Sequence, residues 1–93
     1  MIKIDFRQIG VKNIEGQIEK ADVSKQLGNV MYMQGQNIEE CELGHTIYKT
    51  SKLKPDEDTS VELTDEQVNI VRRFIQPWPY VLRSAIENTL LDD

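Results

Sequence analysis

The sequence contains a single cysteine, Cys41, and a single histidine, His45. One thiol cannot form an intramolecular disulfide, so we expect packing alone to stabilise the fold, as in proteins of a reducing compartment. A structural zinc site normally takes all four ligands from Cys and His, and the chain has only these two residues of that kind. We therefore expect neither a disulfide nor a bound metal.

Long apolar runs and phosphate-binding loops are also missing. No apolar stretch approaches the roughly 20 residues that span a bilayer, and the start of the chain lacks the apolar run of a secretion signal. The five glycines form neither a P-loop nor a dinucleotide fingerprint. We expect a cytoplasmic protein that binds no membrane and no cofactor.

Positive charge is scarce in this chain. Eleven Lys and Arg stand against 16 Asp and Glu, so 11 − 16 gives a net charge of −5. This balance opposes binding to a phosphate backbone, and nucleic acid is not the expected partner. The 93 residues, 39% of them apolar, suffice for one hydrophobic core. The sequence predicts a single domain over 1–93.

The N-terminal segment has the pattern of a strand. Ile2, Ile4 and Phe6 alternate with polar residues, which predicts a half-buried strand over about 2–7. The segment from Asn13 to Gly16 is typical of a turn, and we expect a hairpin or a short second strand around it.

The spacing of apolar residues then changes and predicts a helix over about 23–34. Asp22 is placed to cap its first turn, and Gly35 to end it in the left-handed conformation. Gly28 inside this helix lowers its intrinsic stability by about 1 kcal/mol relative to Ala. Asn37 is placed to cap a second helix.

A polar loop separates these helices from the C-terminal part. Residues 51–60 are charged and contain Pro55, which predicts a flexible loop. Thr64 and Gln67 then have the spacing of a capping box, in which each side chain bonds to the backbone N–H of the other residue. This box predicts a third helix over about 65–75.

Two prolines separate the last helices. Pro77 must end the third helix, because a proline in a helix interior costs about 3 kcal/mol. Pro79 fits the first turn of a fourth helix over about 79–91. The whole pattern predicts an α+β fold in which a small N-terminal β-hairpin packs on three to four helices, the last two forming a helical hairpin.

Cys41 and His45 are the residues best suited to nucleophilic catalysis, and they lie four residues apart on the second predicted helix. Thiol activation favours helix N-termini and positive surroundings, whereas Glu39, Glu40 and Glu42 flank this cysteine. We interpret the pair as structural, with a small buried thiol and a hydrogen-bonded histidine on the face that meets the core. No catalytic residue is assigned, and the chain is not expected to be an enzyme.

Trp78 and Tyr80 are candidate partner-binding residues, because aromatic side chains anchor many interaction surfaces. Trp78 can equally close one end of the core. Arg72 and Arg73, with Arg83, can form a positive patch or a solvated face paired with nearby carboxylates. The favoured interpretation is a non-enzymatic protein that binds a protein partner or itself. The alternative is an acidic regulator that acts on nucleic acid or on a DNA-binding protein.

Four segments carry a resemblance that covers most of the chain: Ile14 to Gly16, Asp22 to Asn29, Ile47 to Tyr48 and Val61 to Gln67. In the order of these four segments, the chain resembles small proteins of unknown function that bacteriophages, prophages and conjugative elements of bacteria encode. The shared motifs are turns and helix caps. The resemblance implies an assembly or accessory role in a mobile element, and it implies no catalytic residue.

Overall fold

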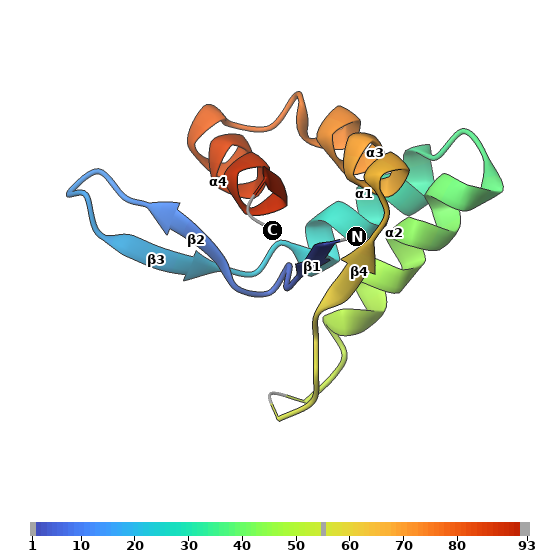
Figure 1. Ribbon diagram of the computed structural model, residues 1–93, viewed down its shortest axis with the longest axis horizontal. Helices are drawn as coiled ribbons and strands as arrows, with labels where there is room; N and C mark the ends of the chain where they lie inside the picture. The colour runs from blue at the N-terminus through green and yellow to red at the C-terminus, as the bar shows by residue number, and fades with distance from the viewer. Residues whose placement is uncertain (1, 55, 92–93) are drawn as a thin grey trace.

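The computed structural model of the protein describes residues 2–54 and 56–91 (Figure 1). Its elements follow one another as β1 (Ile2–Ile4), β2 (Ile9–Lys12), β3 (Ile18–Ala21), α1 (Ser24–Gln34), α2 (Ile38–Thr50), β4 (Val61–Leu63), α3 (Asp65–Ile75) and α4 (Tyr80–Leu91). The predicted α+β class is confirmed, with a β-hairpin near the N-terminus and a final pair of helices.

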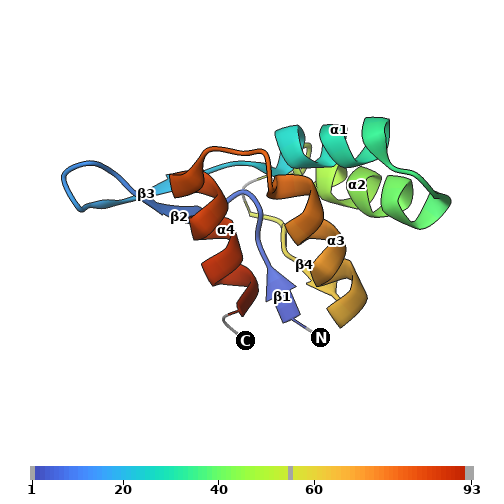
Figure 2. The same cartoon turned by 90° about the horizontal axis from the view of Figure 1, so that it is seen from above.

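The strands form two separate two-stranded sheets. β2 pairs with β3 as a hairpin, and β1 pairs antiparallel with the distant β4, with Ile2 opposite Leu63 and Ile4 opposite Val61. Seen from above, α3 and α4 lie side by side, and the hairpin reaches out beyond α4 (Figure 2). The α1–α2 pair lies at the other end of the molecule.

The first strand ends earlier than the predicted 2–7. The backbone N–H of Arg7 donates to the Asp5 carboxylate (2.9 Å), and that of Gln8 donates to the Asp5 carbonyl (3.1 Å). These bonds close a turn immediately after β1. Phe6 is fully buried inside that turn, so its place in the alternating pattern reflects burial and not strand pairing.

The predicted turn between Asn13 and Gly16 is confirmed. The Asn13 side chain accepts from the N–H groups of Glu15 (3.0 Å) and Gln17 (2.9 Å), and Gly16 has a positive φ of 83°. A residue with a side chain adopts that φ only with strain, whereas glycine adopts it freely. The turn therefore fixes the β2–β3 hairpin by local chemistry alone.

One hydrophobic core joins the two sheets to the four helices. Its buried members are Ile4, Phe6, Ile9, Val23, Leu27, Met31, Leu43, Ile47, Val61, Leu63, Val68, Val71, Ile75, Ile86 and Leu90. Every helix contributes to this set, as do β1, β2 and β4, but none of these core residues comes from β3. The outer strand of the hairpin thus lies outside the core.

Helices α1 and α2 approach each other closely through two glycines. A Cβ on Gly28 would lie 2.6 Å from the Gly44 carbonyl oxygen, and a Cβ on Gly44 would lie 2.7 Å from the backbone nitrogen of Tyr32. A Cβ atom essentially never comes this close to another heavy atom, so the spacing of the two helices requires glycine at both positions. This packing explains why α1 tolerates a residue of poor helix propensity.

The end of α1 differs from the predicted left-handed glycine. Gly35 has φ −63° and ψ 137°, which is an extended conformation. A Cβ at this position would lie 2.8 Å from the Cys41 sulfur, which shows how closely the backbone here approaches α2. Proximity to the next helix, and not a positive φ, explains the glycine.

The predicted helix starts are confirmed to within one residue: α1 begins at Ser24 and not at 23, and α4 begins at Tyr80, directly after Pro79. The Asn37 side chain accepts from the Glu40 N–H (3.0 Å), and Thr64 and Gln67 form both bonds of the capping box. At α1 the residue preceding the helix is Val23, whose side chain makes no capping bond. Asp22 acts from one residue earlier by accepting from the N–H (3.0 Å) and hydroxyl (2.7 Å) of Ser24.

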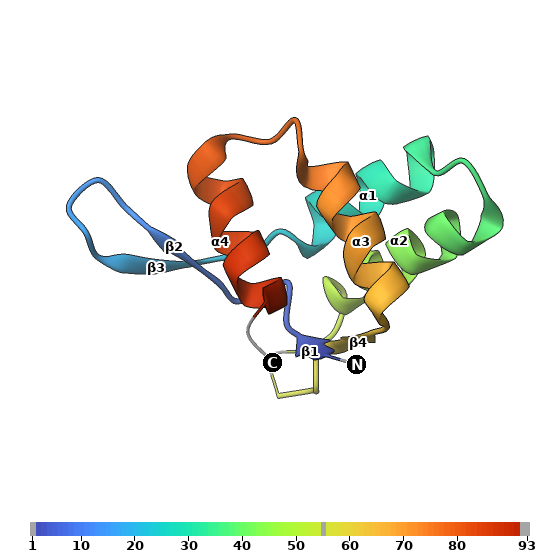
Figure 3. The same ribbon diagram turned by 45° about the horizontal axis from the view of Figure 1, so that its top comes forward.

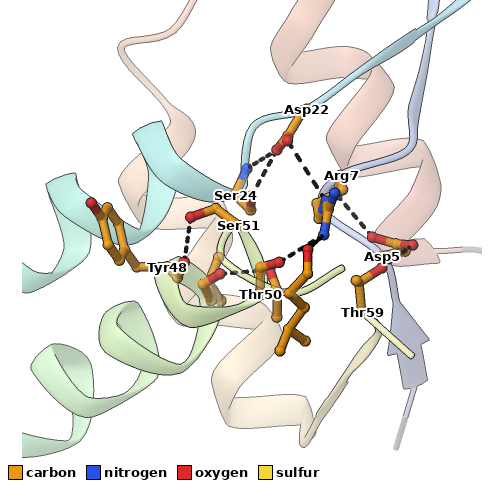
Figure 4. Close-up of polar contacts among 10 residues, drawn as sticks. Asp5, Arg7, Asp22, Ser24, Tyr48, Thr50, Ser51 and Thr59 are labelled. Atoms are coloured by element: carbon orange, nitrogen blue, oxygen red, sulfur yellow. Dashed lines mark hydrogen bonds and ion pairs between the residues drawn. The ribbon is translucent and has the colours of Figure 1, made fainter. Parts of the chain in front are cut away.

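Arg7 connects segments that are far apart in the sequence (Figure 4). Its guanidinium donates to the carbonyl of Thr50 (3.0 Å), the last residue of α2, and to that of Leu53 (2.9 Å), in the turn that follows the helix. Its Nε also lies 3.8 Å from the Asp22 carboxylate, at the start of α1. One side chain therefore joins the turn after β1 to both helices.

The predicted flexible loop over 51–60 is tied down at both ends. Arg7 holds its beginning, and at its end the Thr59 hydroxyl donates to the Asp5 carboxylate (2.7 Å). Pro55, which the sequence places in the middle of this loop, lies outside the described residues. The two contacts attach both ends of the loop to the turn that follows β1.

A buried carboxylate joins α2 to α3. Glu40 is 5% exposed and accepts from the Gln36 N–H (3.1 Å) and from the Arg73 guanidinium. The Gln36 N–H, and then the hydrogen bond from Arg73, hold the pKa of Glu40 below its ordinary value. The ionised form is thus favoured in the folded state.

This ion pair makes stability depend on pH. Because the folded pKa is lowered, the stabilisation is fully present above the ordinary Glu pKa and is lost as pH falls through the lower folded value. Urea unfolding at a series of pH values should therefore show Glu40→Gln less stable than wild type at neutral pH, with the difference shrinking in acid. Glu39→Gln, which changes an exposed residue of the same turn, is the control. A wild-type advantage over Glu40→Gln that is independent of pH would contradict the assignment.

Candidate protein-docking groove

Large apolar side chains are exposed mainly at two places on the described surface. Those on the hairpin and α4 are Ile14, Ile18, Tyr80 and Val81, and those on α1 and the start of α2 are Tyr32, Met33 and Ile38. Ile18, Tyr80 and Val81 line a hollow of about 400 Å³ between the hairpin and α4, and Ile14 lies in the turn of the hairpin outside this lining. We call this hollow the docking groove, defined by Gly10, Lys12, Ile18, Tyr80, Val81 and Ala85.

The hairpin forms the floor of the docking groove. Lys12 is paired with Ile18, and Gly10 with Lys20, so these four residues share one face of the two-stranded sheet. The Ile18 side chain lies across Gly10, since a Cβ there would be 3.1 Å from Ile18 Cγ2. Ile18 is nonetheless 65% exposed, because no helix covers this strand.

Helix α4 forms the wall of the docking groove, and the base of the hairpin runs beside it (Figure 3). Val81 and Ala85 lie four residues apart on one stripe and Tyr80 lies beside it, whereas Ile86 and Leu90 lie buried in the core. The sequence pattern places Val81 on the core face of this helix, yet Val81 is 52% exposed. The pattern was wrong there because β2 lies beside this side of α4 in place of another helix, and the narrow strand leaves Val81 partly exposed to solvent.

The two aromatic candidates have different surroundings. Trp78 is half-buried against the core, and its backbone N–H donates to the Ile75 carbonyl (3.0 Å) in the link between α3 and α4. Tyr80 is 71% exposed at the rim of the groove. Of the two aromatic residues beside Pro77 and Pro79, Trp78 thus packs against the core and Tyr80 stays accessible to solvent.

Arg83 supports the Tyr80 ring from the next turn of α4. Its guanidinium carbon lies 5.6 Å from the ring centroid, and its Nη1 donates to the Gln76 carbonyl (3.0 Å). A cation over an aromatic face stabilises that arrangement by about 0.5–1 kcal/mol at an exposed site. Tyr80 is therefore held in place before any partner binds, which reduces the entropy lost on binding.

The other basic candidates lie away from the docking groove. Arg73 is directed to Glu40 on α2, and its guanidinium also lies 5.5 Å from the Phe74 ring centroid. Arg72 is half-buried on α3. Arg83 in turn bonds to the α3–α4 link. The contacts of Arg72, Arg73 and Arg83 therefore give no evidence of a shared positive patch. Arg73 pairs with Glu40 and not with a carboxylate of α3 or α4.

Cys41 and His45 are not brought together with other ligands. Cys41 is half-buried, and its sulfur lies 3.4 Å from the Tyr32 carbonyl oxygen, to which the thiol can donate. His45 is exposed, with its ring 6.2 Å from the Tyr32 ring, so the predicted core-facing histidine was wrong. Over 2–54 and 56–91, no group of three His, Cys, Asp or Glu residues is arranged to hold a metal ion.

Sequence patterns alone missed three members of the groove. Ile18 and Val81 look like core residues, and Lys12 looks like an ordinary solvated lysine. One usable signal exists for Ile18, because the strand IEKA has no second large apolar residue at i+2. An isolated apolar residue on a short strand is typical of an uncovered face.

Comparison of the chain with protein-family models, with curated proteins and with solved structures finds no match. These comparisons assign neither a family nor a function. In the part of the chain that the structure describes, no helix combines the length and the apolar character needed to cross a bilayer.

Proposed function

We propose that the protein is a non-enzymatic interaction protein that binds a protein partner through the docking groove. The observation that carries this proposal is that Ile18, Tyr80 and Val81, all exposed, come from two elements and line one hollow. Isolated apolar residues are common on protein surfaces, but a cluster beside a concave site is typical of interaction surfaces. We further propose a cytoplasmic location and an assembly or accessory role, the role that the resemblance of the four sequence segments implies.

Site-specific photocrosslinking in the organism that encodes the chain tests the proposal. Benzoylphenylalanine introduced at Val81 should give a discrete crosslinked protein, because this position lies inside the groove. The same group at Met33, which is also exposed but lies on α1, is the matched control and should give none. Equal crosslinking at both positions, or none at Val81, would contradict the proposal.

A second function, regulation through carboxylates, is favoured by one other surface. Glu39, Glu42, Glu62 and Glu66 come from α2, β4 and α3 and line a hollow of about 300 Å³. Such a surface can imitate a phosphate backbone and occupy a DNA-binding protein. If this second function holds, replacing the four glutamates by glutamine should abolish regulation, while Val81→Asp should leave it intact.

A further inference from the structure

The docking groove has positive charge on its hairpin side. Lys12 lines the groove, and Lys20 shares its face of the hairpin through the pairing with Gly10. Both lysines are exposed. The ion pairs of the described residues involve Lys3, Arg7 and Arg73, so neither hairpin ammonium has an internal carboxylate partner.

Two carboxylates of the neighbouring elements lie outside the groove lining. Glu19 is paired with Val11 and therefore lies on the opposite face of the hairpin. Glu87 lies on another side of α4, where it accepts from the Gln76 side chain (3.4 Å). In a chain of net charge −5, the groove thus combines apolar side chains and uncharged polar groups with one lysine, Lys12, and a second lysine, Lys20, lies on the same hairpin face beside it.

We propose that the segment bound in the docking groove is acidic and amphipathic, an inference that rests on the proposed protein-binding function. Its apolar side chains would pack on Ile18, Val81 and Ala85, with Tyr80 at the rim. Its Asp or Glu side chains would lie beside Lys12 and Lys20. An amphipathic segment laid into a groove in this way is a recurring mode of peptide recognition, and complementary charge adds specificity and association rate.

A protein segment fits these features better than a nucleic acid does. Affinity for a phosphate backbone grows with the number of phosphates neutralised, and two lysines neutralise few. Single-strand binding also relies on successive aromatic stacking platforms, whereas among the described residues Tyr80 is the one aromatic residue that lines the groove. The apolar side chains Ile18 and Val81 match a protein surface.

Selection of random peptides displayed on phage tests this inference with the purified full chain. Three baits are compared: wild type, Val81→Asp and the double variant Lys12→Glu with Lys20→Glu. All three positions are exposed, and thermal unfolding followed by circular dichroism checks that each bait is folded. Tyr80→Ser serves as a second groove variant if Val81→Asp is unstable.

Wild type should enrich peptides that combine Asp or Glu with large apolar residues. Binding of these peptides should be lost with Val81→Asp and weakened about tenfold or more by the charge reversal, and salt should weaken binding to wild type. Enriched peptides that depend on Val81 but not on the lysines would overturn the acidic partner and leave the docking function standing.

Three other results would also overturn the inference. The first is the absence of any groove-dependent peptide. The second is binding of a single-stranded oligonucleotide that the charge reversal abolishes, which would identify a nucleic-acid surface. The third is a dimer, seen by light scattering, that Val81→Asp dissociates, which would identify a second copy of the chain as the occupant.

Discussion

Replacing Gly28 by Ala should destabilise the protein by on the order of 3 kcal/mol, although Ala is the better helix former by about 1 kcal/mol. The added methyl group would lie 2.6 Å from both the Gly44 carbonyl oxygen and the Tyr48 backbone nitrogen. These are backbone atoms of α2, so no side-chain rotation relieves the contact and the two helices must separate. Urea unfolding followed by circular dichroism measures the loss.

Gly44→Ala should show a comparable loss, because its methyl group meets α1 in the same way. Asn29→Ala is the control, since it raises helix propensity at an exposed position of α1 and should be neutral or slightly stabilising. A stabilised Gly28→Ala protein would show that the two helices are farther apart than described.

Replacing Arg7 by Ala should cost about 2 kcal/mol of stability. The guanidinium makes charge-assisted bonds to the carbonyls of Thr50 and Leu53, and its side chain is only 21% exposed. Its loss removes the bond that the Leu53 carbonyl accepts, leaves the Thr50 carbonyl with the Leu53 N–H alone (3.2 Å), and also removes the ion pair with Asp22. Denaturant unfolding should show the loss, and amide hydrogen exchange should show faster opening of the last turn of α2.

Two variants separate the role of Arg7 from general charge effects. Arg7→Lys keeps the positive charge but lacks the planar group that reaches two carbonyls at once, so it should recover only part of the stability. Lys3→Ala removes an ion pair with Asp58 in which both side chains are more than half exposed, and should change stability little. Equal losses for Arg7→Ala and Lys3→Ala would contradict the account.

Features that depend on neighbouring residues could be predicted from the sequence. The turn at Asn13 to Gly16, the cap at Asn37 and the capping box from Thr64 to Gln67 each follow from side chains that bond to backbone within four residues. The order of elements follows from these signals together with apolar spacing. The α+β class could therefore be predicted without knowledge of any distant contact.

Features that depend on distant residues could not be predicted in this way. The pairing of β1 with β4, the bonds of Arg7 and the Glu40–Arg73 pair join segments that the sequence does not relate. The groove shows the same limit. Val81 has the spacing of a core residue, but on that side of α4 its neighbour is β2 of the narrow hairpin, which leaves it exposed. Tyr80 could be found because an aromatic residue beside prolines is a local signal.

The docking groove offers an internal comparison between two exposed tyrosines. Tyr80 is 71% exposed in the groove, and Tyr32 is 55% exposed on α1, away from it. Both side chains react with hydroxyl radicals when they are accessible to solvent. A partner bound in the groove must cover the first and leave the second open, whatever its identity.

Hydroxyl-radical footprinting in cells, read by mass spectrometry, therefore tests the central claim most directly. Oxidation of Tyr80, measured relative to Tyr32 in the same molecules, should fall in cells compared with the purified protein. Val81→Asp should restore the ratio found for the purified protein. An unchanged ratio in cells, or protection of Tyr32 in place of Tyr80, would contradict the claim that this groove is the binding surface.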